Sequence, residues 1–306
     1  MPAPRGKFIW YDVMTHDTKA GSDFYKAVVG WNAAEFPMPD GSDYTVFSQG
    51  QTMVSGLMKI PPDAVAMGAK PCWSGYIAVD DVDADTKRIA GAGGKIMREP
   101  TDIPNVGRFA VAADPGGAVF MIFKPNTDEA SAAHPPMAPG FIGWHELYAG
   151  NIDREWDFYA KLFGWTKERS MDMGAMGLYQ TFAINGVESG GIMNRPPQVP
   201  ASFWNYYLGV DSAAAAMDRI ARHGGKVMMG PQEVPGGAWI VQALDPQGAF
   251  FSLISATKSA PTRPLGALAQ RPRAFSAISA AHGCKTPRAA AISRRFLRLL
   301  FSGDDP

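Results

Sequence analysis

Two carboxylic acids in the sequence each follow a tryptophan by two positions, on segments that alternate like a β-strand. They are Asp12 after Trp10 and Glu146 after Trp144, and 134 positions separate the two pairs. Side chains two apart on a strand share a face, so each acid is expected beside an indole ring. Burial raises the pKa of a carboxyl group, which can then act as a general base. In the alternative reading, the two acids cap backbone groups or pair with an arginine.

Other common catalytic arrangements are missing from the sequence. It has no Ser-His-Asp order with a nucleophile elbow, no phosphate-binding glycine loop and no Cys-x-x-Cys pair. Only Cys72 and Cys284 occur, too few for a thiolate zinc site or a disulfide framework, and we expect a cytoplasmic protein. His145 is predicted on the strand face opposite to Glu146, where a structural role suits it better than a catalytic one.

We expect no nucleic-acid partner and no stable membrane insertion, although the neutral net charge conceals an uneven distribution. The chain has 29 Lys and Arg and 29 Asp and Glu, but residues 257–306 hold nine of the bases and only two of the acids. Residues 1–256 therefore carry a net charge of −7. No apolar run is long enough to span a bilayer. We expect a small-molecule ligand, a monomer or homodimer, and a basic tail over 257–306 that is disordered in solution.

An internal repeat defines the elements that must position the two acids. It predicts two homologous halves, residues 7–126 and 140–256, joined by a proline-rich linker over 127–139. The matching segments are 24–31 with 158–165, 93–97 with 224–228, and 114–117 with 245–248.

Each half divides further into two similar units. The first unit is predicted to begin with a strand over Phe8–Thr15, and a helix follows that starts after Asp17 and stops at Gly30. Asn151 takes the place of Asp17 in the second half. Three strand-like runs come next, and the same order begins again near Trp73. The sequence therefore predicts an α+β fold of four βαβββ units.

This pattern resembles the vicinal oxygen chelate superfamily, which includes glyoxalase I, bleomycin-resistance proteins and extradiol dioxygenases. The resemblance lies in the Phe-Tyr-x4-Gly-Trp motif at the end of the first helix and in Asp-Pro-x-Gly before the last strand, each present twice. The chain looks closest to bacterial two-repeat glyoxalase-like proteins. The resemblance implies two curved sheets, or half-barrels, in tandem, each enclosing a ligand site.

Enzymes of this superfamily hold a divalent metal with His, Gln or Glu from the first and last strands of their units. Indole cannot ligate, thioether is a poor ligand for a hard cation, and hydroxyls with a single amide make a weak site. We therefore predict that the usual metal site is lost and that no cofactor is bound, unless Glu188 joins Glu146 through a shifted register. The corresponding positions are Trp10, Trp144, Ser74, Asn205, Met121 and Ser252, with Ser55-Gly56-Leu57 and Gly190-Gly191-Ile192 on the remaining strands.

Aromatic residues on the predicted strands favour an apolar ligand site, although strand aromatics also fill cores. Two functions remain open. The first is glyoxalase-like lyase, isomerase or hydroxylase chemistry on a small aromatic or unsaturated molecule. The second is non-catalytic binding and sequestration of the bleomycin-resistance kind. The candidate catalytic residues are Asp12 and Glu146, and the candidate ligand-binding residues are Trp10, Trp144, Tyr76, Tyr207, Ser74, Asn205, Met121 and Ser252.

Overall fold

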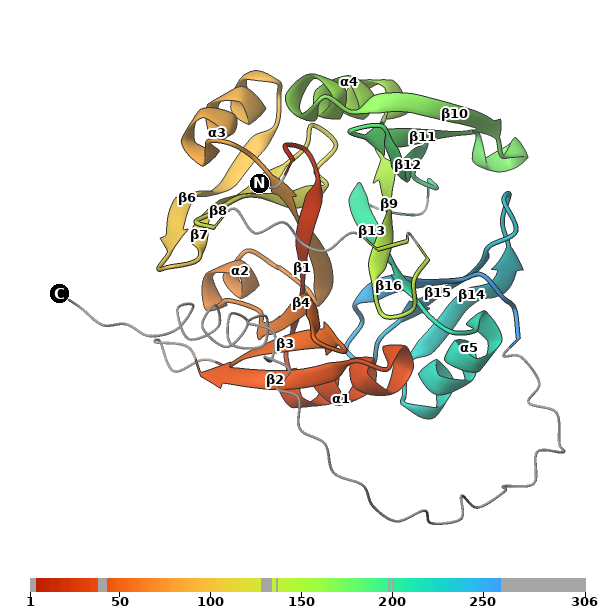
Figure 1. Ribbon diagram of the computed structural model, residues 1–306. Helices are drawn as coiled ribbons and strands as arrows, with labels where there is room; N and C mark the ends of the chain where they lie inside the picture. The colour runs from red at the N-terminus through yellow and green to blue at the C-terminus, as the bar shows by residue number, and fades with distance from the viewer. Residues whose placement is uncertain are drawn as a thin grey trace, which may run out of the picture.

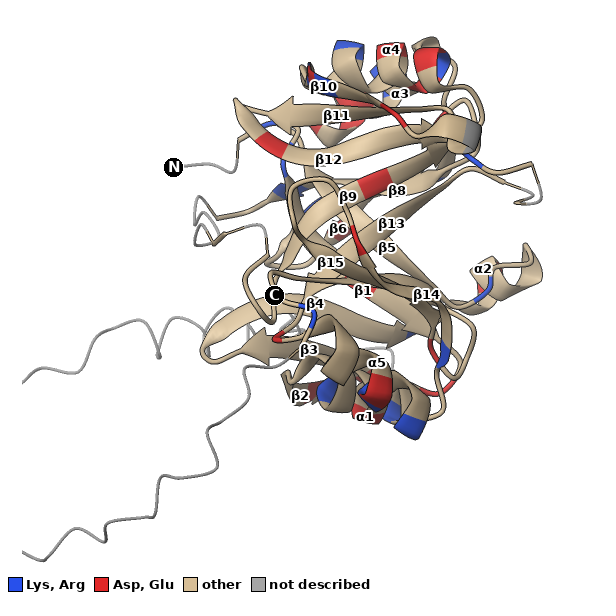
Figure 2. Ribbon diagram, turned by 90° about the vertical axis from the view of Figure 1, so that its right-hand side faces the viewer, with Lys and Arg blue, Asp and Glu red and all other residues tan. Residues whose placement is uncertain are grey.

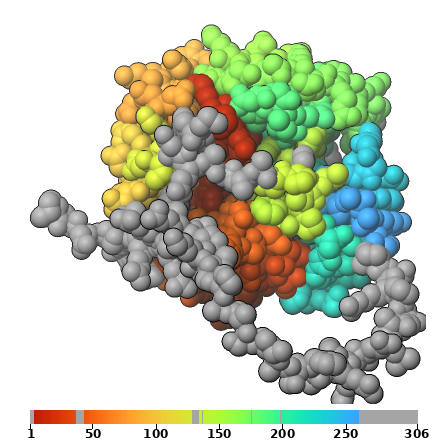
Figure 3. Space-filling model, viewed as in Figure 1, coloured from red at the N-terminus to blue at the C-terminus, as the bar shows by residue number. Residues whose placement is uncertain are grey.

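In the computed structural model, each half of the chain forms one mixed sheet of eight strands, and the two sheets lie side by side (Figure 1). The structure describes residues 4–37, 43–127, 134–135, 137–197, 199 and 201–259. The α+β fold of four βαβββ units is confirmed, because each sheet is built from two such units. Figure 3 shows the first half (red to yellow) packed closely against the second (green to blue).

The strands of the two sheets correspond one to one. The first sheet contains β1 (Phe8–Thr15), β2 (Asn32–Pro37), β3 (Asp43–Gln49), β4 (Thr52–Lys59), β5 (Cys72–Ala78), β6 (Lys95–Ile103), β7 (Gly107–Ala113) and β8 (Val119–Pro125), in the order β2-β3-β4-β1-β5-β8-β7-β6. The second contains β9 (Ile142–Ala149), β10 (Thr166–Asp172), β11 (Leu178–Ile184), β12 (Val187–Asn194), β13 (Phe203–Gly209), β14 (Lys226–Glu233), β15 (Trp239–Leu244) and β16 (Phe250–Ser255), in the order β10-β11-β12-β9-β13-β16-β15-β14.

The helices begin and end where the capping residues indicate. The Asp17 carboxylate accepts a hydrogen bond from Ala20 N at 2.9 Å, and Gly30 ends the helix in the left-handed region with φ 90°. Short α2 was not expected and starts at a Pro-Pro pair, where a missing N–H costs nothing. The helices are α1 (Thr18–Val29), α2 (Pro62–Ala66), α3 (Val82–Gly91), α4 (Ile152–Phe163) and α5 (Ala213–Arg222), with a 3₁₀ turn at Gly174–Met176.

The helices pair across the two halves rather than within one half. Helix α1 contacts α5, and α3 contacts α4. These pairs cover opposite ends of the molecule and carry many of its charged side chains (Figures 1 and 2). None of the helices among the described residues is long and apolar enough to cross a membrane.

The repeated motifs meet each other across the halves. Tyr25 of α1 donates to the Asp245 carboxylate at 3.0 Å and accepts from the Trp73 indole at 2.9 Å. In the symmetric arrangement, Tyr159 of α4 donates to Asp114 at 3.1 Å. Each aspartate also accepts two backbone N–H bonds in its own Asp-Pro-x-Gly turn. Each helix tyrosine is therefore tied to the last turn of the other half.

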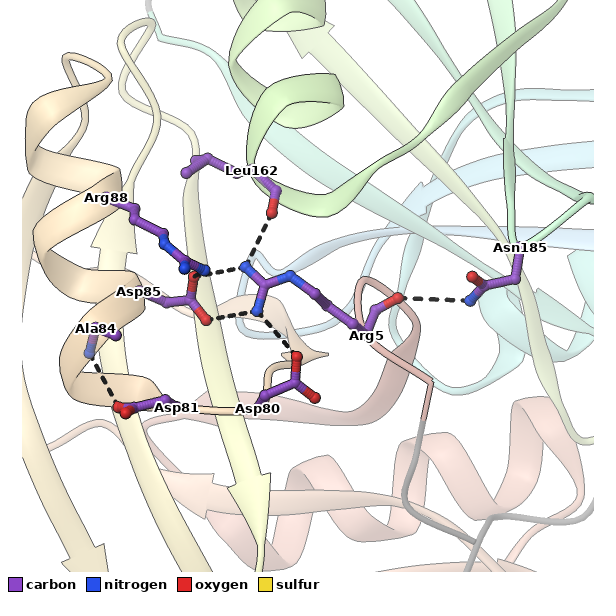
Figure 4. A network of polar contacts seen from close by, with 8 residues as sticks. All are labelled: Arg5, Asp80, Asp81, Ala84, Asp85, Arg88, Leu162 and Asn185. Atoms are coloured by element: carbon purple, nitrogen blue, oxygen red, sulfur yellow. Dashed lines mark hydrogen bonds and ion pairs between the residues drawn. The ribbon is translucent and has the colours of Figure 1, made fainter.

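At each helix pair, an arginine guanidinium group donates a hydrogen bond to a backbone carbonyl oxygen near the end of one helix. Arg5, ahead of β1, binds the buried Asp85 carboxylate of α3 at 2.5 and 2.7 Å and donates to Leu162 O near the end of α4 at 3.0 Å (Figure 4). At the other end of the molecule, Arg219 of α5 donates to Val28 O of α1 at 2.9 Å. The equivalent ends of α1 and α4 are therefore bound by arginines from different elements, Arg219 on α5 and Arg5 ahead of β1.

The middle strands of the two sheets also contact each other through a buried polar pair. The Tyr11 hydroxyl lies 2.6 Å from His145 Nε2, while His145 Nδ1 lies 2.7 Å from Ser189 O. The imidazole stacks on Phe8 with ring centroids 4.1 Å apart. His145 therefore lies on the core side of β9, as the alternation predicts, and serves the interface between the halves.

Burial of His145 makes the stability of the fold depend on pH. Burial lowers the pKa of His145 from 6.5 to about 4, so the imidazole is neutral when folded. The unfolded state binds the proton more tightly, and stability present above pH 6.5 is lost as the pH falls toward 4. The loss amounts to about 3 kcal/mol. Urea unfolding across this range should give a steeper decline for the wild type than for His145→Gln. Equal slopes would contradict this assignment.

Candidate functional site

Asp12 lies in the middle of the first sheet, enclosed by hydrogen-bond donors. The side chain is 2% exposed. One carboxylate oxygen accepts from the Tyr44 hydroxyl at 2.8 Å and from the Trp10 indole at 3.2 Å, and the other accepts from the Tyr76 hydroxyl at 2.6 Å. The Trp10 indole also donates to the Tyr44 hydroxyl at 2.9 Å. Three donors therefore satisfy a carboxyl group on a largely apolar sheet face.

Glu146 holds the equivalent place in the second sheet, where Tyr207 corresponds to Tyr76. It accepts from the Tyr207 hydroxyl at 2.9 Å and faces the Asn205 amide at 3.4 Å. The Trp144 indole donates to the Tyr179 hydroxyl at 3.0 Å, as Trp10 does to Tyr44. We call each set a carboxyl cluster: Trp10, Asp12, Tyr44 and Tyr76 in the first sheet, and Trp144, Glu146, Tyr179 and Tyr207 in the second.

A glycine beside each acid makes room for the tyrosine. Gly56 on β4 pairs with Asp12, and Gly191 on β12 pairs with Glu146. A Cβ on Gly56 would overlap the Tyr44 hydroxyl and the Asp12 carboxylate, and one on Gly191 would overlap the Tyr179 ring. Tyr44 and Tyr179 therefore lie over Gly56 and Gly191, which belong to the strand segments that correspond to metal-ligand positions in the superfamily.

The surroundings of the two acids raise the pKa of both carboxyl groups. Burial raises the pKa of Asp12, and the hydrogen bonds from Tyr76, Tyr44 and Trp10 lower it by less. Burial raises the pKa of Glu146 in the same way. Burial next to these carboxyl groups also raises the pKa of Tyr44 and Tyr76 well above 10.0. The tyrosines therefore stay protonated and donate, while each carboxyl group has an increased affinity for a proton.

The face that carries the acid differs from the core face of the same strands. On the core face, Tyr11 and Val13 are buried against the helices and the other half. On the acid-bearing face, which we call the carboxyl face, Trp10 and Met14 are only half-buried although they occupy a central strand. Apolar side chains on the carboxyl face are therefore partly exposed to solvent.

The structure brings the predicted ligand-binding residues together around the two acids. Ser74 pairs with Asp12 and Asn205 with Glu146 across neighbouring strands. Met121 lies beside Tyr76, and Ser252 lies beside Tyr207. The Asn205 amide donates to the Ser252 hydroxyl at 2.8 Å. Their shared place on the carboxyl face follows from strand alternation, but their role in binding stays a prediction.

Sequence reasoning missed Tyr44 and Tyr179, which come from the neighbouring hairpins. The two tyrosines are 135 positions apart, close to the spacing of the acids, and this was the signal that could have found them. Trp73 and Trp204 also lie on strands but face the core, where they bind Tyr25 and Tyr159. The alternative partners suggested for the acids, backbone caps or an arginine, do not occur among the described residues.

Comparison with known proteins places this chain in a family. A profile described as "Glyoxalase/Bleomycin resistance protein/Dioxygenase superfamily" matches residues 7–122 and 141–253, and the chain belongs to that superfamily. CFP32 of Mycobacterium tuberculosis, which carries a glyoxylase name, is 33% identical over 247 residues, covering 80% of this chain and 93% of CFP32. Anthracycline biosynthesis protein DnrV of Streptomyces peucetius is 30% identical over 276 residues, covering 84% and 96%.

Solved structures share the fold at low sequence identity. The Mn(II)-bound glyoxalase from Novosphingobium aromaticivorans superposes with a TM-score of 0.59 at 16% identity, covering 86% of this chain and 89% of that one. The 2,3-dioxygenase LapB from Pseudomonas sp. KL28 gives a TM-score of 0.57 at 14% identity, covering 88% and 98%. At these identities the likeness shows the fold alone.

The residues at the metal position of this fold do not fit a divalent ion. Each carboxyl cluster offers a single acid, whose lone pairs are directed at tyrosine hydroxyls. Across the part of the chain that the structure describes, no three His, Cys, Asp or Glu side chains lie together as a metal site. Glu188 pairs with Ala183 and binds Arg169 at 2.7 and 3.0 Å, so it does not join Glu146.

The close approach at Gly56 predicts a strong effect of a single methyl group. Gly56→Ala should lower the free energy of unfolding by about 1–3 kcal/mol, because the new Cβ displaces Tyr44 and Asp12 in a packed sheet. Urea unfolding measures the loss. Gly91→Ala, at the end of α3 where a Cβ meets nothing within 4 Å, is the control and should be neutral or stabilising. A Gly56→Ala protein as stable as the control would refute the close packing.

Proposed function

We propose that the protein binds a small, flat aromatic or unsaturated organic molecule on a carboxyl face and moves a proton on it without a metal. Asp12 and Glu146 are the groups that accept and return the proton. The single observation that carries this proposal is the carboxyl cluster itself, which occurs in both halves with the same tryptophan, acid and two tyrosines.

Proton transfer in this cluster runs through a tyrosine, because the acids are nearly inaccessible. Asp12 is 2% exposed, whereas Trp10 and Tyr44 are half-buried. A ligand that gives a proton to the Tyr44 hydroxyl oxygen lets that hydroxyl pass its own proton to Asp12. The raised pKa of Asp12 favours this transfer. Return of the proton at a different ligand atom would complete an isomerisation, and loss of a leaving group would complete an elimination.

The apolar surroundings support a flat and largely apolar ligand. Trp10 and Trp144 expose part of their rings on the carboxyl faces, and tyrosine and methionine side chains surround them. Aromatic rings and thioethers bind planar molecules through large, polarizable contacts. DnrV is named for the biosynthesis of anthracyclines, which are flat, oxygenated polycyclic molecules, and this name supports the same ligand class for the present chain.

Sequestration without chemistry is the second candidate function. The observation in its favour is that both acids already have tyrosine donors and are only 2% and 6% exposed. In this second function, an acid whose hydrogen bonds are already satisfied holds the tyrosines and the tryptophan in place and takes no part in proton transfer. We propose a cytoplasmic location for either function, on the basis of the two isolated cysteines.

Neutral variants of the two acids separate these functions. Asp12→Asn and Glu146→Gln keep the shape of each cluster and an acceptor for one tyrosine, but cannot take up a proton. Tryptophan fluorescence against a panel that includes a dihydroxyanthraquinone identifies a bound molecule, and mass spectrometry identifies any product. For an enzyme, the double variant should still bind and lose at least about 10²-fold in turnover, the usual contribution of a general base. Wild-type turnover by the double variant would refute the proposed role of the acids.

Metal independence has its own measurement. Elemental analysis of the purified protein should find no stoichiometric Ni, Zn, Fe or Mn, and ligand binding should be unchanged after treatment with a chelator. The physical reason is that the tyrosine hydroxyls, rather than metal ligands, surround Asp12 and Glu146. One equivalent of bound metal per chain, lost together with binding on chelation, would contradict the proposal.

A further inference from the structure

The two carboxyl faces differ along one row of paired residues. In the first sheet the row runs from Trp10 through Tyr76, Met121 and Val111 to Arg98. In the second sheet the row consists of Trp144, Tyr207, Ser252, Gln242 and Met229. Both rows begin with a tryptophan and a tyrosine. The first row ends at the cationic side chain of Arg98, and the second ends at the thioether of Met229.

The first carboxyl face is also the more accessible of the two. Three apolar positions on it are half-buried while their counterparts in the second half are buried, with 6–8% of each counterpart exposed. In the second sheet, Tyr207, Ile240 and Ile254 form a separate apolar cluster together with Ala238, and Trp144 and Met229 pack against it. This cluster fills part of the second face. The three pairs are Met58 with Met193, Phe109 with Ile240, and Phe123 with Ile254.

Arg98 brings an unneutralised positive charge to the first carboxyl face. Its guanidinium lies 5.2 Å from the centre of the Phe109 ring. It forms no ion pair with any carboxylate among the described residues. Its charge is close enough to Tyr76 to oppose, in part, the rise in the pKa of that hydroxyl. Asp12, a charged group of the same face, already has three donors.

We propose that the first carboxyl face is the principal ligand site and that its ligand is an aromatic carboxylate. The ring lies among Trp10, Phe109 and Phe123, and the carboxylate binds the guanidinium of Arg98. An arginine fork matches a carboxylate in shape and charge, and an adjacent aromatic ring holds the guanidinium in place. This inference rests on the proposed function and adds to it the charge of the ligand and the half that binds it.

Calorimetric titration with 2-naphthoate and with its methyl ester tests the proposal. The two probes share a ring system, and only the acid carries a negative charge. The wild type should bind naphthoate about tenfold more tightly than the ester, since a hydrogen-bonded charge pair contributes somewhat more than a neutral contact. Arg98→Gln should remove this preference and leave ester binding unchanged. Arg98 is exposed, so this variant should fold, which circular dichroism checks.

Met229→Gln is the matched control, because Met229 ends the equivalent row of the second sheet. It should leave both affinities at the wild-type values. An unchanged preference in Arg98→Gln, or a change confined to Met229→Gln, overturns the inference and leaves the proposed function standing. If neither naphthalene probe binds while other aromatic molecules in the fluorescence panel do, the inference also fails alone. If no aromatic molecule binds, both proposals fail.

Discussion

A carboxyl group buried in an apolar sheet face needs hydrogen-bond donors, and this need governs much of the architecture around Asp12 and Glu146. Removing such a group from water without partners costs several kcal/mol. Tyrosine hydroxyls supply the donors, and two of these tyrosines, Tyr44 and Tyr179, fit only because Gly56 and Gly191 carry no side chain. The acid, its tyrosines and the glycine are therefore one unit in each half. Since the neighbouring tryptophan is more exposed than the acid in each half, a ligand that approaches this unit contacts an aromatic ring before the carboxyl group.

Hydrogen bonds between the two halves help to hold the duplicated fold together. Each helix tyrosine binds the aspartate of the other half's last turn, and each helix end receives an arginine from the other half or from the segment preceding β1. Most of the buried apolar residues form one core that spans both sheets. The carboxyl faces lie on the other side of the sheets from this shared core, and there the row ending at Arg98 differs from the row ending at Met229.

Local patterns in the sequence were sufficient to predict the elements that have local causes. Strand β1, the caps at Asp17 and Asn151 and the glycine ends at Gly30 and Gly164 depend on alternation and on capping chemistry, which a single sequence displays. The side on which Asp12 and Trp10 lie followed from the same alternation. Tyr44 and Tyr179 could not be placed, because their approach depends on how the neighbouring hairpins cross Gly56 and Gly191. The contact between Tyr25 and Asp245 joins residues 220 positions apart, and no periodicity indicates it.

The bonds between Tyr25 and Asp245 and between Tyr159 and Asp114 restrict how such a chain can be recombined. A chimaera that takes one half from a relative also needs a compatible Asp-Pro-x-Gly turn in the other half. The reason is that the tyrosine of each helix donates a hydrogen bond to an aspartate of the other half. A fragment cut at the linker would leave Tyr25 or Tyr159 without its carboxylate acceptor. The two halves are therefore structurally interdependent, although the sequence contains two copies of one pattern.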